Sequence, residues 1–163
     1  MSGDIRLLML ANDRCNQENL LAQLSGRVRA LSAPVDNLLS NRAYMVMAAL
    51  ATRIVGEVTP QRLESVRQAT AVVEEELGET GAFQYLAVLL NDRATGIRDN
   101  QREFGQIIVV RCIESTDART ATATELPWST LHRVCRRIVT EIPDVNRCLY
   151  DLTPKPPATV EYV

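Results

Sequence analysis

The chain of 163 residues has the length of one ordinary domain with room for a helical appendage. It is 46% hydrophobic and 23% charged, a composition typical of a soluble globular protein. Its 18 basic and 20 acidic side chains nearly balance, so charge gives no reason to expect a nucleic-acid partner. The single histidine, His132, excludes a multi-histidine metal site.

Four cysteines are spread along the chain, at positions 15, 112, 135 and 148. None forms a C-x-x-C pair, so neither zinc nor thioredoxin chemistry is indicated, and we expect buried, reduced thiols. The N-terminal residues lack the cationic start and apolar core of a signal peptide, and no apolar run approaches the ~20 residues needed to cross a bilayer. The sequence therefore predicts a cytoplasmic protein with no membrane partner.

Residues 1–52 are expected to form a helical N-terminal extension, because apolar residues recur there at three- and four-residue steps. A first helix of the following domain, 53–163, is predicted to begin at Thr59-Pro60, an N-cap followed by proline. Gly78 is placed to end that helix. Its acidic run 74–76 is expected to be a solvated face.

Two strand-like runs follow, 83–90 and 106–113, and the polar segment 91–100 between them is expected to be a loop longer than a tight hairpin. A second helix is predicted between Pro127 and Pro143, with one apolar stripe. The basic residues off that stripe are read either as solvated or as an anion or partner surface; they are His132, Arg133, Arg136 and Arg137.

Two further strand-like runs, 147–153 and 159–163, are separated by the proline-rich segment 154–157. The order from residue 59 is helix, strand, strand, helix, strand, strand. This order favours an α+β two-layer sandwich, with an antiparallel sheet and helices on one side.

Catalytic motifs are absent from the sequence. There is no phosphate-binding G-x-x-x-x-G-K-[ST] loop, no G-x-G-x-x-G fingerprint and no G-x-S-x-G nucleophile elbow. Without a pair of carboxylates fixed by the fold, no general acid and base can be named. The residues alone indicate no catalytic group, metal or cofactor.

The C-terminal run V-N-R-C-L-Y-D-L-T-P-K-P-P-A-T-V-E-Y (145–162) closely resembles the end of GMP synthetase. R-I-V-G-E-V-T (53–59) resembles the entry to that family's C-terminal domain, and Q-Y-L-A-V-L-L (84–90) resembles one of its strands. Thr120-Ala121 and Leu126-Pro127-Trp128 also agree in order. A weaker similarity at 18–31 is to the last helix of the family's ATP-pyrophosphatase domain. The connecting segment 42–50 departs from the family pattern in every proline and glycine.

The resemblance implies a stand-alone dimerisation domain without the glutaminase and ATP-pyrophosphatase domains. In the family, this domain forms the dimer and places side chains around the phosphate of xanthosine monophosphate (XMP). Carried over by position, the implied nucleotide-binding residues are Arg53, Gln84, Arg147, Lys155, Val160 and Glu161. Two guanidiniums and an ammonium would neutralise the phosphate, and Glu161 would orient a lysine or a ribose hydroxyl.

Three functions remain open from the sequence. The chain is a homodimer that binds an XMP-like purine nucleoside monophosphate and serves a separate ATP-pyrophosphatase in GMP biosynthesis; or it is purely an oligomerisation module; or it is a repurposed enzyme that acts on a nucleotide-like substrate. As an alternative to a phosphate site, Arg147 and Lys155 would merely balance Asp151 and Glu161 on the surface. On its own, the chain is not expected to act as a GMP synthetase.

Overall fold

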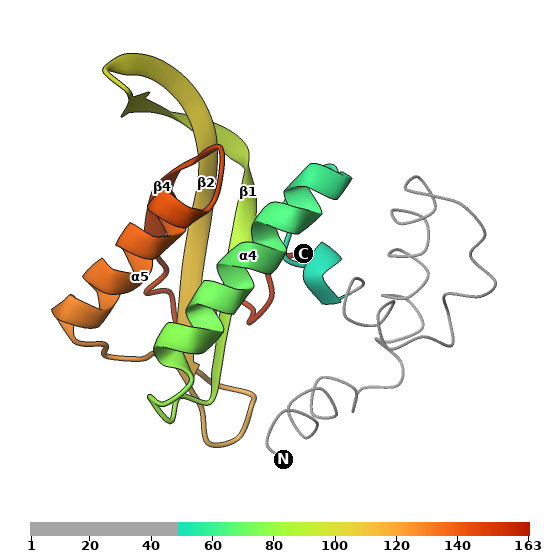
Figure 1. The fold of residues 1–163 in the computed structure, drawn as a ribbon. Helices are drawn as coiled ribbons and strands as arrows, with labels where there is room; N and C mark the ends of the chain where they lie inside the picture. The colour runs from blue at the N-terminus through green and yellow to red at the C-terminus, as the bar shows by residue number, and fades with distance from the viewer. Residues whose placement is uncertain (1–48) are drawn as a thin grey trace, which may run out of the picture. The chain divides into compact units, whose positions relative to one another are not determined.

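The computed structural model describes residues 49–163, which form one compact unit, Ala49–Val163. The predicted helical extension, except for its last few residues, and most of the altered segment 42–50 lie outside the described residues. The elements are α4 (Pro60–Leu77), β1 (Gln84–Arg98), β2 (Gln101–Glu114), β3 (Thr122–Ala123), α5 (Trp128–Glu141) and β4 (Val145–Tyr150). Both helices lie on one face of the sheet, which confirms the α+β two-layer fold (Figure 1).

The helices begin and end where the sequence predicts. The Thr59 hydroxyl accepts a hydrogen bond from the backbone N–H of Arg62, Pro60 is the first helical residue, and Gly78 follows the last turn of α4. α5 follows Pro127 and ends before Pro143. No helix in the part of the chain that the structure describes is long and apolar enough to cross a membrane.

The sheet has two different faces because strand residues alternate in direction. Val110 lines the same hollow as Val134 of α5, so it points toward the helices. Its neighbour Val109 points the other way and packs with Leu86 and Val88 in a buried apolar cluster. The molecule therefore buries side chains on both faces of the sheet, although helices cover only one.

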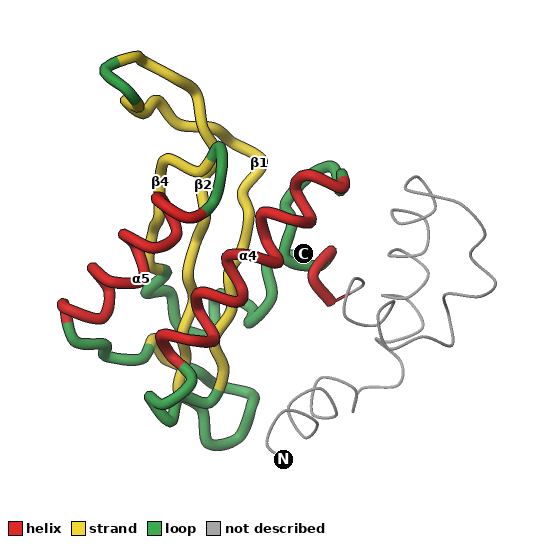
Figure 2. Tube along the Cα trace, viewed as in Figure 1, coloured by secondary structure: helices red, strands yellow, loops and turns green. Residues whose placement is uncertain are grey.

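The prediction of a loop at 91–100 is wrong, because β1 and β2 continue through this segment as a long two-stranded arm (Figure 2). The arm consists of residues 93–98 of β1, residues 101–106 of β2 and the turn between them. The strands are joined by Asp99 and Asn100 alone, both with positive φ, 51° and 60°. That conformation fits a two-residue hairpin turn. The segment is polar because the arm extends past the helices and meets water, while its backbone groups pair within the hairpin.

The C-terminal part of the sheet also differs from the prediction. β1, β2 and β3 pair antiparallel, but β4 runs parallel to β2, since α5 carries the chain back to Gln106 of β2. The predicted strand at 159–163 is not formed. Prolines in 154–157 remove backbone donors, and only Lys155 makes an isolated bridge, to Ala121. The short β3 was not predicted.

Candidate functional site

The candidate site lies on the sheet face opposite the helices, under the C-terminal segment 155–163. Val160 of this segment packs against the cluster of Leu86, Val88 and Val109. Val160 is thus half-buried and fixes the segment on β1 and β2. This apolar contact brings the polar residues on either side of Val160 to the sheet.

Arg53 and Glu161 face each other at the outer edge of β1. The backbone carbonyl of Arg53 accepts a hydrogen bond of 2.8 Å from Leu89 N–H, which fixes its position beside the strand. Its Nε lies 3.7 Å from Oε2 of Glu161, and the two side chains are only 14% and 24% exposed. Both of these atoms are buried without a hydrogen-bond partner. The two atoms that face each other across this pair therefore lack hydrogen bonds.

Burial raises the pKa of the Glu161 carboxyl above its ordinary value, and the nearby Arg53 only partly offsets this effect. Gln84 begins β1, two residues before Leu86, so alternation places it on the same face as the apolar cluster. Its side chain is half-buried. Arg53, Gln84, Val160 and Glu161 therefore belong to one side of the sheet or its edge.

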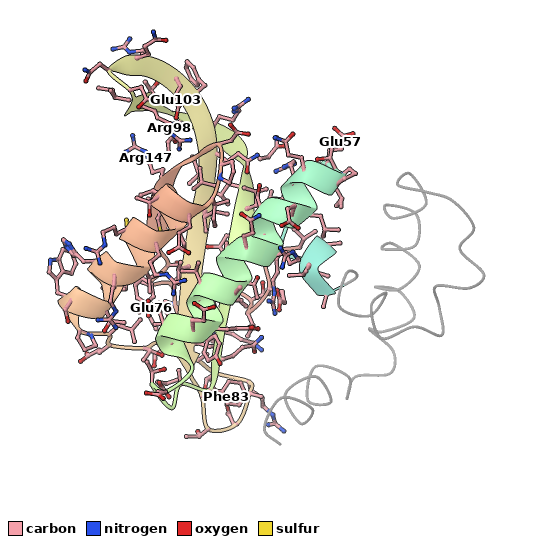
Figure 3. The ribbon with its side chains drawn as sticks, viewed as in Figure 1. Glu57, Glu76, Phe83, Arg98, Glu103 and Arg147 are labelled. Carbon is pink, nitrogen blue, oxygen red and sulfur yellow. The ribbon has the colours of Figure 1, made fainter. Side chains whose placement is uncertain are left out.

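Arg147 and Lys155 lie toward opposite ends of the sheet. Arg147 pairs with Ile107 in β2, and its Nη2 donates 3.0 Å to the carbonyl of Thr95 on the arm; Figure 3 shows it beside the arm residues Arg98 and Glu103. Lys155 lies next to Ala121, and its Nζ donates 2.9 Å to the carbonyl of Ala118. Since β2 advances roughly 3.4 Å per residue, the two backbones are on the order of 20 Å apart.

Asp151 does not pair with Arg147 or Lys155, as the surface alternative would have it. Its Oδ2 lies 2.5 Å from Nη1 of Arg111, in the middle of β2, and accepts a 2.7 Å hydrogen bond from the hydroxyl of Tyr162. The prediction missed Arg111 and Tyr162. The available signal was a single arginine within an apolar strand run, which requires a buried partner.

Two of the four basic residues of α5, Arg133 and Arg137, pair with carboxylates of the neighbouring helix. Glu76 of α4 accepts a hydrogen bond of 2.6 Å from Nε of Arg133 and one of 3.1 Å from Nη1 of Arg137. Arg137 also contacts Glu75 and Glu141. The expectation of a solvated acidic face is therefore wrong for Glu76, which joins the two helices.

Three of the four cysteines lie in the described part, and all three are free thiols. Cys112 is buried, while Cys135 and Cys148 are half-buried. Burial raises the pKa of Cys148 to about 12, so this thiol is protonated at neutral pH. Within residues 49–163, no group of three or more His, Cys, Asp or Glu side chains could hold a metal ion.

Two hollows lie elsewhere on the described surface. An apolar one of about 490 Å³ lies along α5 and β4, lined among others by Trp128, Leu131 and Tyr150. A polar one of about 410 Å³ lies between the start of α4 and the base of the arm, lined among others by Gln61 and Asp144. Neither is lined by any of the six residues proposed for the nucleotide.

Comparison with known proteins gives one family. A family model described as the GMP synthase C terminal domain matches residues 71–162, more than half of the chain. One subunit of the glutamine-hydrolysing GMP synthase of Methanopyrus kandleri is 45% identical over 120 residues, covering 69% of this chain and 38% of that protein.

Similar relatives occur in other archaea. The corresponding GMP synthase subunit of Methanocella arvoryzae is 45% identical over 134 residues, covering 82% of this chain and 44% of the relative. The glutamine-hydrolysing GMP synthase of Aeropyrum pernix is 47% identical over 117 residues, covering 69% of this chain and 23% of the relative. The chain thus matches less than half the length of each of these curated relatives. Because the family model matches more than half of the chain and these relatives are about 45% identical to it, the chain belongs to the GMP synthase C-terminal domain family.

Proposed function

We propose that the chain is part of a GMP synthase and binds a purine nucleoside monophosphate, XMP or a close analogue, through its phosphate. The pair formed by Arg53 and Glu161 carries this proposal. Arg53 holds a positive charge at a fixed place, and its Nε has no hydrogen-bond partner although it is buried. A phosphate dianion could supply the hydrogen bonds that this guanidinium lacks, because arginine binds phosphate with a planar fork of donors.

The other proposed ligands have different places in this arrangement. Gln84 lies on the same side of the sheet as Val160 and gives the nucleotide a polar contact. Val160 offers its backbone, because its side chain packs on the apolar cluster. Arg147 and Lys155 are too far apart in one chain to meet a single phosphate, so the proposal assigns at least one of them to the site of a paired copy. The nucleotide site is then completed by dimerisation.

A homodimer is supported by large apolar side chains that stay exposed near the C-terminus of the chain. Leu149 and Leu152 are 45% and 70% exposed. Tyr162, whose hydroxyl donates a hydrogen bond to Asp151, is also exposed. Large exposed apolar groups favour burial against a second copy of the chain. The isolated chain should therefore be dimeric at tens of micromolar by light scattering.

A separate ATP-pyrophosphatase is the further partner in this proposal. The similar relatives include proteins named as one subunit of a GMP synthase, and this chain spans only 38% of the Methanopyrus kandleri protein and 44% of the Methanocella arvoryzae protein. The remaining part of such relatives has no counterpart in the 163 residues. We therefore expect adenylation of the substrate to require another polypeptide segment or another protein.

Calorimetry with XMP and xanthosine tests the nucleotide site. XMP should bind at least tenfold more tightly than xanthosine, because only XMP carries the phosphate. Arg53→Ala should weaken XMP binding about ten- to a hundredfold, the cost of removing one charged donor. Lys155→Ala should weaken it in the same range and leave the dimer intact.

Arg67→Ala is the matched control, since Arg67 is an exposed arginine of α4 whose contact is with Glu64 in the same helix. It should leave XMP affinity unchanged. Equal affinity for XMP and xanthosine, or equal effects of Arg53→Ala and Arg67→Ala, would contradict the nucleotide site and favour the oligomerisation module.

A further inference from the structure

Arg111 is the most deeply buried charged side chain of the described residues, at 1% exposure in the middle of β2. Its Nη1 donates to Asp151, but its Nε and Nη2 have no hydrogen-bond partner. A buried charge is costly unless an opposite charge compensates it. Asp151 is thus the group on which the burial of Arg111 depends.

Asp151 uses both carboxylate oxygens. Oδ1 accepts a hydrogen bond of 2.8 Å from the backbone N–H of Thr153. Oδ2 accepts one from Nη1 of Arg111 and one of 2.7 Å from the hydroxyl of Tyr162. Burial opposes ionisation, yet the hydrogen bonds from Thr153 and Tyr162 and the charge of Arg111 hold the pKa of Asp151 below its ordinary value. The carboxylate therefore stays ionised and holds two elements at once, β2 and the C-terminal segment.

Glu161 stands between two anchors of this segment. On one side, Val160 packs on the apolar cluster, and on the other, Tyr162 reaches Asp151. The Glu161 Oε2 atom that faces Arg53 has no hydrogen bond of its own. The Glu161 carbonyl accepts a hydrogen bond from the Thr159 hydroxyl, so the contacts that tie this residue to the sheet are those of its two neighbours in sequence and its ion pair with Arg53.

We infer that Asp151, with Arg111 and Tyr162, is a positioning group that holds Glu161 against Arg53. We call these three side chains the clamp. Arg111 holds Asp151 on β2, and Asp151 accepts a hydrogen bond from Tyr162, so the clamp ties the segment that carries Glu161 to the sheet. Its role in nucleotide binding rests on the proposed function, whereas its action on Glu161 does not.

Tyr162→Phe tests the clamp with the loss of a single hydroxyl. NMR of the full 163-residue chain should show lower ¹⁵N order parameters at residues 160–162. The Glu161 carboxyl, followed by ¹³C chemical shift, should titrate closer to an ordinary glutamate, because burial is what raises its pKa. Tyr150→Phe is the control: its hydroxyl contacts carbonyls of Cys112 and Thr124, away from the segment. It should change neither measurement.

The binding experiment separates this inference from the proposed function. If XMP binds the wild-type chain, Tyr162→Phe should weaken it about three- to tenfold, the range for one hydrogen bond. Loosening of residues 160–162 in a chain that does not bind XMP would support the clamp and overturn the nucleotide site. An unchanged Glu161 titration in Tyr162→Phe would overturn the clamp, whether or not XMP binds.

Asp151→Asn gives a second measurement. It should loosen the segment at least as much as Tyr162→Phe, because it removes the charge and leaves one acceptor oxygen for the donors of Arg111, Thr153 and Tyr162. Adding Tyr162→Phe should then have a smaller effect than it has in the wild type. Additive loosening would show that Tyr162 acts independently of Asp151 and would contradict the clamp. If Asp151→Asn prevents folding because Arg111 is then buried without a compensating charge, the clamp is still tested by comparing Tyr162→Phe with Tyr150→Phe in the order parameters and the Glu161 titration.

Discussion

Nε of Arg53 lies 3.7 Å from Oε2 of Glu161, so residues from the two ends of the described unit meet at the edge of β1. The carboxylate is partly buried and its pKa is raised, which means that its ionised form is disfavoured in the folded state. The pair therefore has a pH dependence of opposite sign to that of an ordinary surface salt bridge.

Glu161→Gln should reveal this sign. The folded state retains the Glu161 proton at pH values where the unfolded chain has lost it, so the wild type loses stability as pH rises from the ordinary glutamate pKa through the raised one. The variant lacks this loss. Urea unfolding between about pH 4 and pH 7 should show the variant gaining stability relative to the wild type as pH rises. Parallel curves would contradict the burial of this carboxylate.

Glu76→Gln should weaken the contact between α4 and α5. Hydrogen bonds from Arg133 and Arg137 lower the pKa of Glu76, so its contribution is present at neutral pH and is lost as pH falls below the ordinary glutamate value. With Arg133 half-exposed, we expect a loss of about 1 kcal/mol at neutral pH. Glu74→Gln, at an exposed position of the same helix, should cost little. Equal losses would rule out a specific role for Glu76.

The two-residue turn of the arm predicts opposite effects at Asn100. Its φ of 60° is tolerated by asparagine and glycine but strained for a β-branched side chain. Asn100→Gly should leave the free energy of unfolding unchanged or raise it, and Asn100→Val should lower it by about 1–2 kcal/mol. Chemical denaturation of both variants checks this. A stable Asn100→Val protein would show that the turn has another conformation.

Gly96→Ala should disturb the contact between the arm and β4. An added Cβ would come within 2.5 Å of the Asn146 side chain, which donates 2.8 Å to the carbonyl of Ala94. The arm must shift, and we expect a loss of about 1–3 kcal/mol, the usual cost of overpacking. Asn146→Gly removes the obstructing atoms, so the double variant should be less destabilised than the sum of the single ones. Strict additivity in urea unfolding would place the two residues apart.

Local signals in the sequence were sufficient for the helices and for the fold class. Thr59-Pro60 and Gly78 mark the ends of α4 by backbone chemistry, which acts at short range. The loop prediction at 91–100 was wrong because a polar segment can be exposed to water and still form a strand. Most of residues 91–98 are exposed, yet this part of β1 pairs with β2. The direction of β4 was missed because it depends on where α5 returns the chain, which no local pattern encodes.

The candidate site was predictable only through family resemblance. That resemblance named Arg53 and Glu161, and the fold brings this pair together although more than a hundred residues separate them. It did not indicate the distance between Arg147 and Lys155, which follows from sheet register. Arg111 was within reach of sequence reasoning, since one charge within an apolar strand needs a partner, but nothing local identifies Asp151 as that partner.

The parallel pairing of β2 and β4 has a consequence for a chain leaving the ribosome. The β1–β2 hairpin closes through two residues and can form early, whereas β4 can reach β2 only after β3 and α5 have emerged. Until then, the part of β2 that β4 covers stays unpaired on one side, and Arg111 has no carboxylate beside it. β4, the last strand to be synthesised, is therefore the one that completes the sheet. Nascent chains that stop at α5 should be prone to aggregation and to chaperone binding.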